Sequence, residues 1–174
     1  MKIKALAMTG CLAAAMAVPG LAKTNDNTFK ALENFRRVAD DAARQADKLQ
    51  ALAESDQTDW VVNGSYLTAV RNDVNRMGKM LANLQEMRDS ATPAERAAID
   101  KAAEWLPALA ANTTEALNYL NKYQGEFWAP GFRNPVDALA VDSARIASAT
   151  SDAVRLHELQ AKARRLRRGL EAGA

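Results

Sequence analysis

The sequence predicts an all-α protein: an up-down-up-down four-helix bundle with a long aromatic loop between its third and fourth helices. Apolar residues recur at spacings of three and four over long stretches, which is the period of a helix face. Helix-start motifs and short polar segments separate these stretches. Because short connections between long amphipathic helices favour antiparallel neighbours, the bundle topology follows.

The first 22 residues have the features of a secretory signal peptide. Lys2 and Lys4 precede a mostly apolar run over 5–18, and small residues at Gly20 and Ala22 predict cleavage after Ala22. The run is shorter than the ~20 apolar residues that a membrane-spanning helix needs. We therefore expect residues 23–174 to form one domain without a transmembrane segment, exported to a bacterial periplasm.

Cleavage would also remove Cys11, the only cysteine of the chain. Lipid attachment to Cys11 is the alternative, but the preceding "MTG" lacks the usual aliphatic residue. A mature chain without cysteine has no disulfide, thiolate metal site or covalently attached haem. It would carry 21 basic residues, the 23 of the whole chain less Lys2 and Lys4, against 21 acidic residues. This balance argues against general nucleic-acid binding.

Four apolar seams define the expected helices. The first three cover 32–53, 60–84 and 99–123, and the fourth covers 139–156 before it shifts to a new series over 159–170. These are the faces that we expect to meet in the core.

Helix-capping motifs between the seams predict where helices begin. "TPAE" places Thr92 at a helix N-cap with Glu95 completing a capping box, and "NPVD" predicts a similar start at Asn134. Pro107 lies inside the third seam and predicts a bend near Ala103, because proline cannot donate the backbone hydrogen bond of a helix.

The segment "YQGEFWAPGFRNP" over 123–135 is rich in aromatic residues. In the predicted topology the loop over 124–133 lies at the same end as the first interhelical connection. It is either an apolar lid on the bundle core or a binding site for a partner or a small apolar ligand. The candidate binding residues at this end are Trp60, Tyr123, Phe127, Trp128 and Phe132.

No set of residues predicts catalysis or a metal site. His157 is the only histidine, and a triad with Ser143 and Asp152 would lack a strained nucleophile turn and an oxyanion hole. His157 and Met80 lie at matching heights for non-covalent haem, but core packing explains the methionine more simply. We predict no cofactor. Asp142 falls on a seam and needs a partner, such as Arg145 or Arg71, if it is buried.

The chain ends with five cations in the seven residues of "KARRLRR". Cations complement the dipole at a helix C-terminus, but this density also predicts contact with an anionic partner such as phospholipid, lipopolysaccharide or an acidic protein. The candidate residues are Lys162, Arg164, Arg165, Arg167 and Arg168.

Together these features predict a non-enzymatic exported protein that acts through protein or envelope contacts. The alternative is a carrier or sensor that binds a small apolar ligand or non-covalent haem. The oligomeric state is not determined by the sequence.

Overall fold

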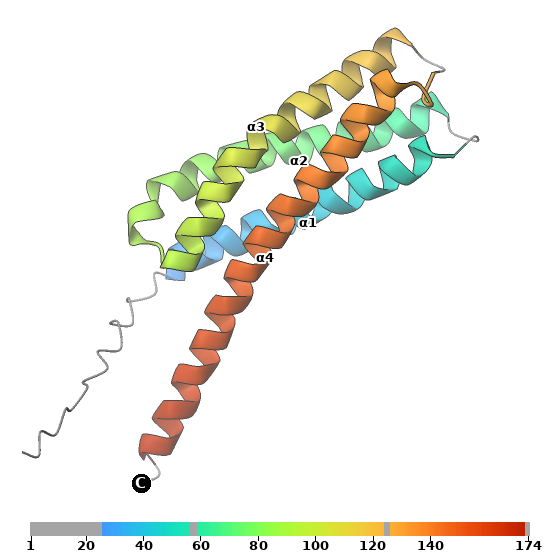
Figure 1. Cartoon of the computed structure of the whole chain (residues 1–174). Coiled ribbons are helices and arrows are strands. Elements are labelled where there is room, and N and C mark those ends of the chain that lie inside the picture. The colour runs from blue at the N-terminus through green and yellow to red at the C-terminus, as the bar shows by residue number, and fades with distance from the viewer. Residues whose placement is uncertain (1–25, 56–58, 124–125, 173–174) are drawn as a thin grey trace, which may run out of the picture.

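The computed structural model describes residues 26–55, 59–123 and 126–172. Within these ranges four long helices follow one another (Figure 1): α1 (Asp26–Ala53), α2 (Trp60–Glu86), α3 (Pro93–Lys122) and α4 (Pro130–Ala172). A short 3-10 helix, η1 (Arg88–Ser90), joins α2 to α3. Each helix packs on its neighbour in the chain, and α4 packs back on α1, which confirms the predicted up-down bundle. The signal peptide predicted over 1–22 lies outside the described residues.

Side-chain caps fix the starts of α2 and α3. The Asp59 carboxylate accepts a hydrogen bond from the Val61 amide at 3.1 Å. The Thr92 amide donates to Glu95 Oε2 at 2.8 Å, and the Glu95 amide donates to Thr92 Oγ1 at 3.3 Å. The capping box predicted from "TPAE" is therefore confirmed, and it satisfies two amides that would otherwise lack a partner at the helix end.

The predicted start of α4 at Asn134 is wrong by about one turn. The helix begins at Pro130, because the amides of Phe132 and Arg133 already donate to the Ala129 carbonyl at 2.9 and 3.0 Å. Pro135 lies inside the helix and removes one backbone hydrogen bond near its start. Complete burial of Phe132 offsets that cost, and the connection before α4 is shorter than predicted.

The core follows the predicted seams of the first three helices, whose apolar residues are buried except at the ends of α2 and α3, where Trp60 and Tyr123 are exposed. In α4 the predicted seam is confirmed at Leu139, Ile146 and Ala153, which are buried, and is wrong by one position at Asp142, Ala149 and Leu156. The buried residues are their neighbours Ser143, Thr150 and His157.

Local hydrogen bonds explain why polar residues occupy the core face of α4. The Ser143 hydroxyl donates to the Ala140 carbonyl at 3.1 Å, and the Thr150 hydroxyl donates to the Ile146 carbonyl at 2.9 Å. A buried hydroxyl that is satisfied by its own helix costs little, so hydropathy alone misplaces this face.

Candidate functional site

The end of α4 extends beyond the other three helices (Figure 1). His157 is its last buried residue. From 158 to 172 every side chain is exposed except Ala161 and Arg164, which are half-buried. At 1.5 Å per residue this projecting segment, residues 158–172, is about 22 Å long. Its backbone is satisfied by the helix itself, while its side chains are available for contact.

A buried polar pair fixes the point where α4 leaves the bundle. His157 Nδ1 lies 3.0 Å from Glu95 Oε1, and the His157 ring stacks on Phe29 with the ring centroids 3.9 Å apart. Glu95 is 1% exposed and also caps α3. One carboxylate and one imidazole therefore join α1, α3 and α4 immediately before the projecting segment.

An exposed apolar face, which we call the leucine stripe, begins at Leu156, just before the projecting segment, and continues along it. The stripe consists of Leu156, Leu159, Ala163, Leu166 and Leu170, at alternating spacings of three and four. Its four leucines are 42%, 55%, 63% and 77% exposed in chain order. At 100° per residue the stripe points about 150° away from the core face of α4. The bundle therefore cannot cover it, although the two faces belong to one continuous helix.

The five predicted cations surround this stripe. No acidic side chain in the described ranges forms an ion pair with Lys162, Arg164, Arg165, Arg167 or Arg168. The only acids of the projecting segment are Glu158 and Glu171, so the segment has a net positive charge. Leucines and cations thus lie together on an exposed helix.

At the opposite end of the bundle, part of the predicted aromatic cluster is present. Phe127 and Phe132 are buried, with their ring centroids 5.6 Å apart. Tyr119 links them to Tyr123, at centroid distances of 6.2 Å to Phe132 and 4.7 Å to Tyr123. These contacts form an apolar cover over the core, which is how a lid would pack.

The remaining aromatic candidates face solvent. Trp128 is 70% exposed and Trp60 is 48% exposed, and neither stacks on another ring in the described residues. Trp60 lines a shallow groove of about 510 Å³ between α2 and α3, together with Gly64, Leu117 and Leu120. The structure therefore separates these two tryptophans from the buried phenylalanines.

A second groove lies further along α2 and α3. It has a volume of about 560 Å³ and is lined mainly by apolar side chains, including Val74 and Leu106. Pro107, predicted to bend α3, forms part of its wall opposite Gly78. Nothing lies within 4 Å of the position that a Gly78 Cβ would take, so glycine leaves this groove open. Lys79 at its edge is the one charged lining residue.

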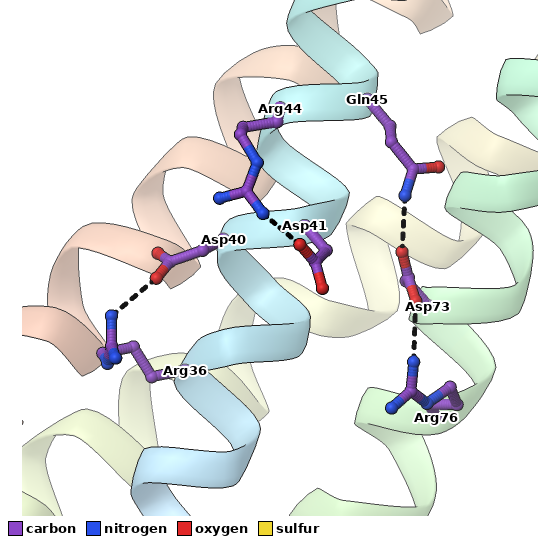
Figure 2. Close-up of polar contacts among 7 residues, drawn as sticks. All are labelled: Arg36, Asp40, Asp41, Arg44, Gln45, Asp73 and Arg76. Atoms are coloured by element: carbon purple, nitrogen blue, oxygen red, sulfur yellow. Dashed lines mark hydrogen bonds and ion pairs between the residues drawn. The ribbon is translucent and has the colours of Figure 1, made fainter.

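Polar side chains also meet between α1 and α2, as Figure 2 shows. Gln45 donates to Asp73 at 3.0 Å, and Arg76 donates to the same carboxylate at 3.3 Å. Burial raises the pKa of Asp73 above its ordinary value; Arg76 opposes this shift and Asp41 adds to it. Asp41 itself pairs with Arg44. Each carboxylate of this layer has a basic or amide partner, as expected for a structural contact.

The candidate polar residues Asp142, Ser143 and His157 are each held by a contact within the bundle. Asp142 accepts a hydrogen bond from Asn112 at 3.1 Å and lies 3.5 Å from Arg145, the nearer of its two predicted partners. Ser143 is bonded to its own helix, and His157 faces Glu95. The Ser143, His157 and Asp152 triad is therefore not assembled.

Over the described residues, no three histidine, cysteine or acidic side chains are arranged to hold a metal ion. None of the described helices combines the length and hydropathy needed to cross a membrane. Comparison of the chain with protein-family models, with curated proteins and with solved structures returned no match.

Proposed function

We propose that this protein is a non-enzymatic, exported helical bundle whose projecting segment docks onto an anionic partner surface. One observation carries the proposal: the end of α4 presents five cations, none of which forms an ion pair within the described residues, beside an exposed leucine stripe. The bundle acts as the rigid base, because the Glu95–His157 pair fixes the helix where it leaves the core. Export rests on the signal-peptide features of residues 1–22.

Both the leucines and the cations of the projecting segment support docking. Exposed leucines on one helix face lose water-accessible apolar area when a partner covers them. Unpaired cations attract an anionic surface over roughly a Debye length and speed the encounter. The exposed Trp60 and Trp128 at the other tip form a second, smaller contact surface in this proposal, whereas Phe127 and Phe132 are already packed in the core.

The test compares the full mature chain with a chain that lacks residues 162–174. Binding to polyglutamate and to phosphatidylglycerol vesicles is measured at low and high salt. The proposal expects salt-sensitive binding to at least one probe, and loss of that binding on truncation. Val141→Ser is the matched control for an exposed apolar residue outside both contact surfaces. Equal binding by the truncated chain would overturn the proposal.

The groove at Gly78 and Pro107 favours a second candidate function, the binding of a small apolar ligand. Its volume of about 560 Å³ is within the range of ligand pockets, and its lining is mainly apolar. Lys79 at the edge would suit a ligand with an acidic group. The haem alternative would instead use His157, whose Nδ1 already faces Glu95.

Native mass spectrometry of the protein recovered from a bacterial periplasm tests this second function. A carrier is expected to retain extra mass, and Gly78→Leu is expected to remove it by filling the groove. Gly169→Leu, at another glycine with open space around its Cβ, is the control. The absence of extra mass from both the parent protein and the Gly169→Leu control would contradict a carrier function.

A further inference from the structure

We propose that the leucine stripe binds one helix of another protein, and that this partner helix carries an apolar seam with acidic residues on both sides. This inference rests on the proposed docking function and specifies the partner. The stripe extends from 156 to 170, two heptads of the pattern by which helices pair side by side. It needs a helix of roughly 21 Å to cover it.

The width of the stripe distinguishes a helix from a lipid surface. A helix that lies in a membrane interface has a broad apolar face, commonly with Trp or Phe. Here the large aliphatic residues from 156 to 172 are confined to the two heptad positions of the stripe, with Ala163 in the middle, and the range holds no Trp, Phe or Tyr. Five of the twelve other positions from 156 to 172 hold cations. A narrow seam of this kind is the one that fits into the groove of a second helix.

The residues beside the stripe specify the charge of the partner. In the heptad frame set by the leucines, the flanking positions hold Arg155, Gln160, Lys162, Arg167 and Gly169. Three of these five residues are cationic and none is acidic. Flanking residues face those of the partner helix, so opposite charges there favour pairing.

The same flanks disfavour a second copy of this chain. In a parallel or an antiparallel pair of identical segments, cations would face cations, and like charges held side by side oppose association. Arg164, Arg165 and Arg168 lie on the far side of the helix. Because they do not touch the partner helix, they contribute only long-range attraction, which raises the association rate.

Binding of synthetic peptides to the mature chain, measured by fluorescence anisotropy, tests the inference. The probe is a three-heptad helix with leucine in the seam and glutamate at the flanking positions; the glutamates keep it from pairing with itself. One control peptide carries lysine at the flanks, and a second carries serine in the seam. The glutamate-flanked peptide is expected to bind at least about tenfold more tightly than either control.

Three protein variants identify the surface that the peptide contacts. Leu159→Ser with Leu166→Ser is expected to weaken peptide binding about tenfold or more, since it removes the centre of the stripe. Arg155, Lys162 and Arg167 changed to Gln should weaken binding severalfold and reduce its salt dependence. The matched control changes Arg164, Arg165 and Arg168 to Gln and should mainly slow association. All eight residues are exposed or half-buried, so circular dichroism and melting temperature should stay unchanged.

Several outcomes would overturn the inference while leaving general docking intact. Equal weakening by the flanking and far-side triple variants would mean that the charge as a whole, not the seam, binds the partner. Tighter binding to phosphatidylglycerol vesicles than to the glutamate-flanked peptide would identify a lipid surface instead. Self-association that is lost in the leucine variant would identify a second copy.

Discussion

The two parts of α4 use the same helical backbone in opposite ways. From 130 to 157 the helix packs against α1 and α3 through Phe132, Ile146 and Val154. From 158 onward its leucines face solvent on another side, more than half exposed at Leu159, Leu166 and Leu170. The apolar pattern does not stop at the end of the bundle but changes face.

This change of face shows what each part contributes. A residue that packs in the core contributes to the free energy of unfolding, whereas an exposed residue on the projecting segment contributes only when a partner covers it. Substitutions in the two parts should therefore separate stability from binding. The Glu95–His157 pair marks the boundary between them.

The most direct contrast places one substitution in each part of the helix. Phe132→Ala should lower the free energy of unfolding by about 3–5 kcal/mol, because it empties a fully buried ring position. Leu166→Ala should change it by no more than about 0.5 kcal/mol. Urea unfolding at several protein concentrations measures both values. A large loss for Leu166→Ala that depends on concentration would show that the projecting segment is already packed in an oligomer.

The aromatic tip offers a second contrast, between adjacent residues. Phe127→Ser should destabilise the protein by about 2–4 kcal/mol, since Phe127 is buried against Phe132. Trp128→Ser should have little effect on stability, because its side chain is 70% exposed. Thermal unfolding of the two variants distinguishes them. Similar melting temperatures for Phe127→Ser and the parent would contradict a lid at this position.

Breaking the Glu95–His157 pair should have an intermediate effect on the free energy of unfolding. Glu95→Ala removes the acceptor for the Thr92 amide and leaves His157 Nδ1 without its partner in a buried site. We expect a loss of about 2–3 kcal/mol, from one helix cap and one buried hydrogen-bond partner. Glu158→Ala, which removes the same charge from an exposed position, is the control. Equal stability of the two variants would mean that the pair does not fix α4.

Local patterns in the sequence predicted the helices and most of the core. The capping box at Thr92 and the seams of α1 to α3 follow from spacing and residue type, whereas for Phe127 and Phe132 the sequence left a lid and a binding site as alternatives. The shift of the apolar series beyond Leu156 was also visible, because it changes the helical register. On α4 the spacing identified only part of the covered face, Leu139, Ile146 and Ala153, and missed the buried Ser143, Thr150 and His157.

The features that the sequence did not predict depend on contacts between residues that are far apart in the chain. Glu95 and His157 are 62 positions apart, so nothing in either local stretch indicates that they meet. The early start of α4 likewise depends on the close approach of Gly131 to Tyr119, where an added Cβ would lie 2.4 Å from the Tyr119 ring. Such contacts are set by how whole helices pack, and a local motif such as "NPVD" is overridden by them.

The smallest expected effect concerns Asp73, inside the bundle. Since burial raises its pKa above the ordinary value of 3.8, the folded state binds a proton more tightly there than the unfolded state does. Stability is therefore lost as the pH rises from below 3.8 through the raised pKa. Asp73→Asn keeps an acceptor for Gln45 and removes this loss, so it should stabilise the protein at neutral pH, by about 0.5 kcal/mol or less, and not at pH 3.

Urea unfolding between pH 3 and pH 7 measures this difference, with Asp152→Asn on the exposed side of α4 as the control for removing one negative charge. A gain that is equal at pH 3 and pH 7 would contradict titration of Asp73 as its cause. A decrease in stability at neutral pH would mean that the contact with Arg76 outweighs burial. In either case the peptide-binding affinity of the projecting segment should not change, because Asp73 lies between α1 and α2, whereas the leucine stripe points away from the bundle.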